Sequence, residues 1–126
     1  SIIPFELIIE WCKENPNIAP YFVARTINIF DQNDDGSKQP SKLFIALLEN
    51  FGDLDSLGSE FSANLGTRGW TGSLVPYLES DKLALTPLCN HTNHNVRSWV
   101  REYIDYLEKA IAYEKSRDDE HVLGIY

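Results

Sequence analysis

The chain has 126 residues, of which 43% are hydrophobic and 24% are charged, and its 11 Lys and Arg against 19 Asp and Glu give a formal net charge of −8. These values fit one globular domain with one hydrophobic core, so we expect a single domain over residues 1–126. The negative charge opposes approach to a phosphate backbone or an anionic membrane surface, which argues against nucleic acid and membranes as partners.

Further features of the sequence predict a cytoplasmic protein. Cys12 and Cys89 each lie in an apolar segment, where a reduced thiol is more common than a disulfide in a domain of this size. The N-terminal segment has no basic region and is interrupted by Pro4, which argues against a signal peptide. No apolar run reaches the roughly 18 residues that span a bilayer. The chain contains no Met, so Ser1 either follows a removed initiator or begins a fragment of a longer protein.

The residue pattern predicts six helices and no strand, which places the chain in the all-α class. The first helix covers about residues 4–14 and ends at Asn15-Pro16. The second follows Asn17 as its N-cap and ends before the polar loop 31–40. Its inward face is predicted to consist of Ile18, Phe22, Thr26, Ile29 and Phe30.

The middle of the chain predicts two more helices, separated by glycine and aspartate. A third helix covers about residues 40–50, and Gly52 lies where a left-handed C-terminal cap is expected. Asp53 or Asp55 then caps a fourth helix, in which Gly58 allows close approach of a neighbouring element.

The chain after residue 72 predicts a short helix and then the longest one. Ser73 caps the fifth helix, and Pro87 should kink or split it near its end. Asn93 or Asn95 caps the sixth helix. Residues at three- and four-residue steps predict its buried stripe: Val96, Trp99, Val100, Tyr103, Ile104, Leu107, Ala110 and Ile111.

Paired in order, the helices form three hairpins that begin near Pro4, Pro40 and Ser73. The spacing of roughly 33 to 36 residues predicts a helical repeat, in which hairpins stack side by side to seal a continuous core. We therefore expect a right-handed αα superhelix. The alternative is a closed up-and-down helical bundle, which is favoured if the short linkers fold back.

The segment LCNHTNHNVRSWVREYIDYL, residues 88–107, resembles the end of a HEAT or armadillo repeat, in which a polar turn precedes Val-Arg and spaced aliphatic residues. The resemblance implies that Val96 and Val100 fill the core between repeats and that Arg97 hydrogen-bonds along the stack. A wider stretch is similar to the C-terminal helical-repeat region of large bacterial proteins, including some multidomain NTPases of defence systems. Such repeats imply a scaffold or protein-binding surface, normally without catalysis.

The loop 31–42 offers an alternative function as a calcium site. Four of its residues match the first half of an EF-hand loop: Asp31, Asn33, Asp35 and Gly36. The second half does not match, because Lys38 and Lys42 stand at the eighth and twelfth positions, where two ammonium groups would oppose the cation. A solvated loop between helices is the structural alternative.

Residues 89–94 offer a second metal-binding alternative. Cys89, His91 and His94, with Cys12 or His121 as a fourth ligand, could surround zinc in a regulatory domain. Their spacing is not a strong zinc signature, so a core cysteine at a helix end with two histidines in the turn is the competing interpretation.

Two enzyme hypotheses have weaker support in the sequence. Ser73 lacks a GxSxG context and a preceding strand, and its role as a helix cap explains it. A HEAT-like DNA glycosylase would use aromatic, basic and acidic residues on a concave face. Its candidate residues are Trp70, Trp99, Arg97 and Asp105, and the charge of −8 argues against this function.

The prediction is therefore a non-catalytic protein-binding domain, possessing no cofactor or metal, that acts alone or as the terminal cap of a longer solenoid. Its partner is expected to be a protein. The residues expected to contact that partner are Trp70, Arg97, Arg101, Tyr103 and Tyr126.

Overall fold

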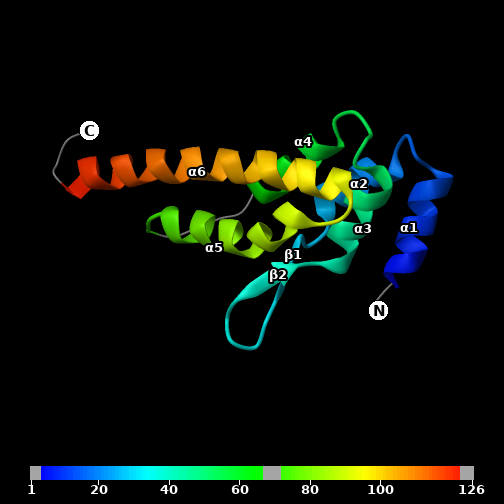
Figure 1. Ribbon diagram of the computed structural model, residues 1–126, viewed down its shortest axis with the longest axis horizontal. Coiled ribbons are helices and arrows are strands. Elements are labelled where there is room, and N and C mark those ends of the chain that lie inside the picture. The colour runs from blue at the N-terminus through cyan, green and yellow to red at the C-terminus, as the bar shows by residue number, and fades with distance from the viewer. Residues whose placement is uncertain (1–3, 67–71, 123–126) are drawn as a thin grey trace.

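The computed structural model describes residues 4–66 and 72–122, and most of this part of the chain is helical (Figure 1). The helices are α1 (Phe5–Glu14), α2 (Ala19–Thr26), α3 (Lys42–Phe51), α4 (Leu57–Gly66), α5 (Val75–Leu85) and α6 (His94–Val122), and a 3₁₀ turn, η1 (Thr86–Asn90), follows α5. A short hairpin of β1 (Phe30–Gln32) and β2 (Lys38–Pro40) separates α2 from α3. The all-α class is confirmed at this level, with the small hairpin as an addition that the sequence pattern did not predict.

The second helix is shorter than predicted, and its predicted inward face is wrong for Ile18, Phe22 and Thr26, whereas Ile29, beyond the end of the helix, is buried as predicted. Ile18 and Phe22 are 71% and 59% exposed. The buried side of α2 instead consists of Ala19, Pro20, Val23 and Ala24. This side packs on α4 and α3, because its small side chains let the helices approach closely. The helix ends at Thr26, since the next residue is extended.

The hairpin uses the polar loop that follows α2. Phe30 pairs with Pro40 and Gln32 with Lys38, and Gly36 takes a φ of +88° in the connecting turn. The strands are too short to give a period-two pattern, which is why the sequence did not reveal them. The Lys38 ammonium lies 4.4 Å from the centroid of the Phe30 ring and forms an ion pair with the fully buried Asp81 of α5. The hairpin is therefore fixed to the C-terminal half of the chain.

The end of α3 meets the start of α6 at a glycine. Gly52 has a right-handed φ of −63°, so the predicted left-handed cap is wrong. A Cβ on this residue would lie 2.5 Å from the Leu48 carbonyl oxygen and 2.6 Å from Cβ of Asn95. Glycine is thus required here for close packing and not for backbone conformation.

Two of the three helix boundaries predicted after residue 72 are confirmed. At the other one, Leu74 and not Ser73 occupies the N-cap position of α5, although the Ser73 hydroxyl accepts a hydrogen bond from the Val75 amide (3.1 Å). The helix gives way to η1 around Pro87. The side-chain oxygen of Asn93 accepts from the amides of Asn95 (2.9 Å) and Val96 (3.2 Å), which caps α6.

Helix α6 runs along the molecule and packs on α5, η1 and α3 (Figure 1). Val96, Val100 and Leu107 of α6 are fully buried in one core with Phe44 of α3 and Phe61 of α4. At the N-terminal end, α1 packs on α3 while α2 packs on α4. Within the described residues, no helix combines the length and hydropathy that crossing a lipid bilayer requires.

Candidate protein-binding groove

A groove of about 630 Å³ lies between α4 and the N-terminal half of α6. Its volume falls within the roughly 300–1,000 Å³ typical of ligand pockets. One wall consists of small residues in and just before α4: Ser56, Gly58, Ser59, Ser62 and Gly66. The other wall consists of larger residues of α6: Trp99, Glu102, Tyr103 and Tyr106. We refer to these nine residues as the α4/α6 groove.

The wall on α6 follows from helix geometry. Trp99, Glu102, Tyr103 and Tyr106 recur at three- and four-residue steps, which places them along one side of the helix. This side adjoins the buried stripe that seals the core. Tyr103 belongs to both, since it is 8% exposed and also lines the groove.

Trp99 anchors the groove because four neighbours fix its ring. Its Nε1 donates a hydrogen bond to the Gly58 carbonyl oxygen (3.1 Å). The edge contacts to Phe44 and Phe61 have centroid distances of 5.5 and 5.7 Å. Tyr103 stacks on the ring at 4.9 Å with an interplanar angle of 9°. These four contacts hold the indole in place.

Gly58 makes this arrangement possible. A Cβ on this residue would lie 2.8 Å from Cδ1 of Trp99, closer than side-chain atoms normally approach. The prediction that Gly58 permits close approach of a neighbour is therefore confirmed. In contrast, a Cβ on Gly66, at the far end of the same helix, would meet no atom within 4 Å.

The outer part of the groove presents aromatic rings and one carboxylate. Tyr106 lies 5.4 Å from Tyr103 at an angle of 37°, and it is 57% exposed. Glu102 is exposed, and its carboxylate has no ion-pair or hydrogen-bond partner among the described side chains. Among the described residues that line the groove, none is Lys, Arg or His. The groove therefore combines electron-rich rings with uncompensated negative charge.

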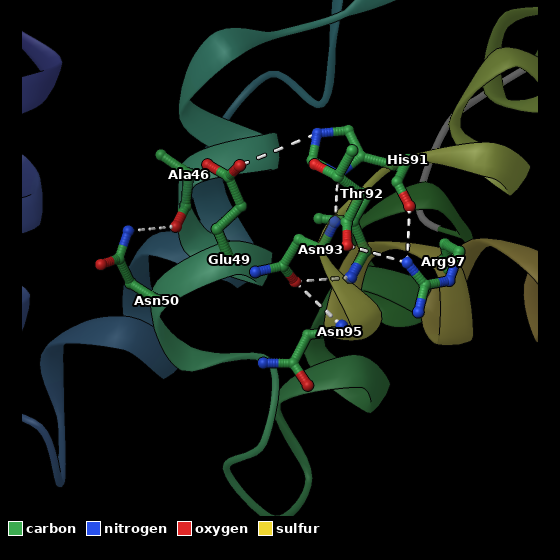
Figure 2. A network of polar contacts seen from close by, with 9 residues as sticks. Ala46, Glu49, Asn50, His91, Thr92, Asn93, Asn95 and Arg97 are labelled. Carbon is green, nitrogen blue, oxygen red and sulfur yellow. Dashed lines mark hydrogen bonds and ion pairs between the residues drawn. The ribbon is translucent and has the colours of Figure 1, made fainter.

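A polar network at the turn before α6 fixes where this helix begins (Figure 2). Nδ1 of His91 accepts from the Asn93 amide (3.0 Å), and Nε2 lies 3.7 Å from a carboxylate oxygen of Glu49 on α3. Nη1 of Arg97 donates to the carbonyl oxygens of His91 (2.8 Å) and Thr92 (2.9 Å). The network positions the α6 wall of the groove relative to α3.

The predicted partner-contacting residues have different locations. Tyr103 lines the groove. Arg97 binds the turn carbonyls described above, and Nε of Arg101 donates to the Cys89 carbonyl oxygen (2.9 Å), so both arginines support the turn and lie outside the groove lining. Trp70 and Tyr126 lie outside the described residues. The contact of all five with a partner stays a prediction.

Sequence reasoning missed most of the groove. Glu102 and Tyr106 carry only the three- and four-residue spacing from Trp99 as a signal. The small residues opposite them, such as Ser59 and Ser62, have no signal of their own, since serine is common on exposed helix surfaces.

The loop 31–42 uses its polar groups within the hairpin. Oδ1 of Asp35 accepts hydrogen bonds from the Ser37 hydroxyl (2.6 Å) and amide (3.0 Å). These bonds, led by the hydroxyl, hold the pKa of Asp35 below its usual range. Lys38, at the eighth position, forms the ion pair with Asp81. The geometry is that of a tight turn closed by its own side chains.

Among the described side chains, the cysteines and histidines proposed as zinc ligands either bind other groups of the protein or lie apart from one another. Nδ1 of His91 binds a backbone amide, and His94 is exposed. Cys12 is fully buried and burial raises the pKa of its thiol. Both Cys12 and Cys89 are free thiols. Within the described part of the chain, no three His, Cys, Asp or Glu side chains are grouped to hold a metal ion.

The residues named in the enzyme hypotheses take part in local contacts. The Ser73 hydroxyl lies 2.5 Å from a carboxylate oxygen of Asp118. Asp105 forms an ion pair with Lys109 (3.0 Å) one turn along α6. Trp99 is fixed in the groove wall, and Arg97 binds the turn carbonyl oxygens as described above.

A second apolar surface lies on α1 and α2, at the end of the molecule opposite the C-terminal end of α6 (Figure 1). Leu7, Trp11, Ile18 and Phe22 are between 44% and 71% exposed. Trp11 and Phe22 make an edge contact at 6.4 Å. Exposed charged residues of both signs, such as Glu10 and Lys13 of α1, lie on the same helices, so this surface does not favour one sign of charge as the groove does.

Comparison with known proteins adds no relative to this description. Neither the models of protein families, nor the curated proteins, nor the solved structures gave a match to the chain, so its assignment depends on the geometry above.

Proposed function

We propose that this domain is a non-catalytic protein-binding module of three stacked helical hairpins of the HEAT type, and that its partner docks in the α4/α6 groove. The packing of α1 on α3 and of α2 on α4 supports stacking of the first two hairpins, since stacked hairpins make these contacts between equivalent helices; the third hairpin joins them through α6, which packs on α3. The proposed compartment is the cytoplasm, where thiols such as those of Cys12 and Cys89 stay reduced.

The observation that carries the proposal is the rigid aromatic wall of the groove. Aromatic residues dominate the energetics of protein interfaces because they bury a large area with few rotatable bonds. Trp99 and Tyr103 are already fixed by stacking and hydrogen bonding, so little side-chain entropy is lost when a partner binds. Tyr106 remains more than half exposed at the mouth of the groove, where it is available for contact.

A photo-crosslinking experiment in native cells tests the proposal. p-Benzoyl-phenylalanine replaces Tyr106 in one variant and Phe22 in a control variant, since the two aromatic side chains are almost equally exposed, at 57% and 59%. We expect a discrete protein adduct from the Tyr106 position only. The adduct partner is then identified, purified and titrated against the domain by calorimetry.

A blocking variant makes the test specific to the groove. Gly66→Leu adds a side chain into open space at the groove, so it should fold normally and prevent both the adduct and the calorimetric signal. The absence of an adduct from the Tyr106 position, an identical set of adducts from both positions, or unchanged binding by Gly66→Leu would contradict the proposal.

A further inference from the structure

We infer that the α4/α6 groove accommodates a basic side chain, arginine or lysine, of the partner protein. The inference rests on the proposed function, because it assigns a chemical class to what occupies the same groove. Glu102 and the ring of Tyr106, which is 57% exposed and lies beside the stacked pair of Trp99 and Tyr103, provide the two features that a cation requires: a carboxylate and an aromatic face.

The electrostatics of the groove favour a cation over other ligands. An anionic segment would meet Glu102 with no cationic group in the described lining to offset the repulsion. A purely apolar segment would remove water from the Glu102 carboxylate without providing hydrogen bonds in its place, and this desolvation would weaken binding. A basic side chain avoids both costs, because its aliphatic part packs on the rings while its charged end reaches the carboxylate.

Among the described residues, two basic side chains on or beside α4 and α6 already have acidic partners of their own. Arg25 of α2 pairs with Glu60 of α4 at 2.9 Å, and Lys109 pairs with Asp105 at 3.0 Å. Glu102 is left as the unpaired acid that lines the groove among the described residues. The net charge of −8 adds a long-range attraction for a basic partner.

The protein itself contains pairs of the kind that we infer. The Lys38 ammonium lies 4.4 Å from the Phe30 ring centroid. The Arg117 guanidinium carbon lies 5.9 Å from the Tyr113 ring centroid, on the same helix as the groove wall. Both distances are within the roughly 6 Å at which a cation and a ring attract each other.

Two short peptides test the inference by NMR titration of the isotope-labelled domain. One has a single arginine in a glycine-serine background, and the other has citrulline, its uncharged isostere, at the same position. We expect the arginine peptide to bind about five-fold more tightly, as one cation over an aromatic ring adds to affinity. The signals that should move are the Trp99 indole N–H, identified from Trp99→Phe, and the amides that line the groove.

Variants of one residue separate charge from shape. Glu102→Gln should reduce the affinity for the arginine peptide to that for the citrulline peptide, and Glu102→Lys should abolish binding. Glu10→Gln, which makes the same charge change on an exposed residue of α1, should leave the affinity unchanged. Tyr106→Leu should lower the affinity for the arginine peptide more than the affinity for the citrulline peptide, because it removes the aromatic ring but keeps an apolar side chain.

Equal affinity for the two peptides, no shift for either peptide, or a response centred outside the groove would overturn the inference. The crosslinking experiment gives an independent answer on the proposed function. An adduct from Tyr106 together with equal peptide affinities would mean that the groove binds a protein through an uncharged segment. The absence of an adduct would instead contradict the proposal that a partner docks in the groove.

Discussion

The substitution Gly58→Ala tests how tightly α4 and α6 meet at the groove. The new Cβ would lie 2.8 Å from Cδ1 and 3.0 Å from Nε1 of Trp99, where contact atoms normally stand about 3.5–4.0 Å apart. The indole must therefore move by roughly 0.5–1 Å, which strains its hydrogen bond to the Gly58 carbonyl and its stacking on Tyr103.

Three contributions set the expected magnitude. Overpacking of this kind costs about 1–3 kcal/mol. The weakened hydrogen bond costs about 1 kcal/mol more. Replacing glycine by alanine in a helix returns at most about 1 kcal/mol. We therefore expect the free energy of unfolding to fall by about 2 kcal/mol, on the basis of these three values.

Gly66→Ala is the matched control, since it makes the same chemical change in the same helix without any atom within 4 Å of the new Cβ. It should leave stability unchanged or raise it by up to about 1 kcal/mol. Urea unfolding followed by far-UV circular dichroism measures both variants, and near-UV circular dichroism reports the packing of Trp99. Equal effects of the two substitutions would refute the close approach of Gly58 and Trp99.

Further predictions concern the hairpin and the buried thiol. Lys38→Met removes a cation that pairs with the buried Asp81 carboxylate and should lower the free energy of unfolding, measured in urea, by about 3 kcal/mol. Adding Asp81→Leu should restore most of this loss. A double variant whose loss equals the sum of the two single losses would contradict the pairing. Because hydrogen bonds from Ser37 hold the pKa of Asp35 down, the stability they add is present above the ordinary carboxyl pKa and is lost as the pH falls through the lower folded value. NMR titration should place this pKa below that of the unfolded chain, and Ser37→Ala should raise it; no rise would exclude Ser37 as the cause. Burial raises the pKa of Cys12, so alkylation at mildly alkaline pH should modify the other cysteine first and reach Cys12 only when the fold opens, as mass spectrometry would show; equal rates for the two thiols would contradict the burial.

The helices could be predicted from the sequence because their signals are local. The oxygen of Asn93 and the hydroxyl of Ser73 bind amides two or three residues away, so short patterns contain all the information. The inward face of α2 could not be predicted in this way. The set with Phe22 and the set with Val23 both recur at helical spacing, and the packing of α4, far along the chain, decides which set is buried.

The candidate site depends on even more distant information. Trp99 donates a hydrogen bond to the carbonyl oxygen of Gly58, 41 residues earlier. The groove therefore cannot be recognised from either of its two walls alone. Gly52 illustrates a related limit. A glycine after a helix indicates a left-handed cap or close packing equally well, because both require the absence of a Cβ, and only the position of Asn95 identifies the second case.

The long C-terminal helix has a consequence for how the chain is made. Val96, Val100 and Leu107 complete the core around Phe44, yet they are synthesised long after it. At roughly 5–20 residues per second, the ribosome needs several seconds to add them. During that interval the nascent chain exposes apolar surface around Phe44 that α6 later covers, so this core closes only after α6 has been synthesised, and chaperone protection is most valuable before that point.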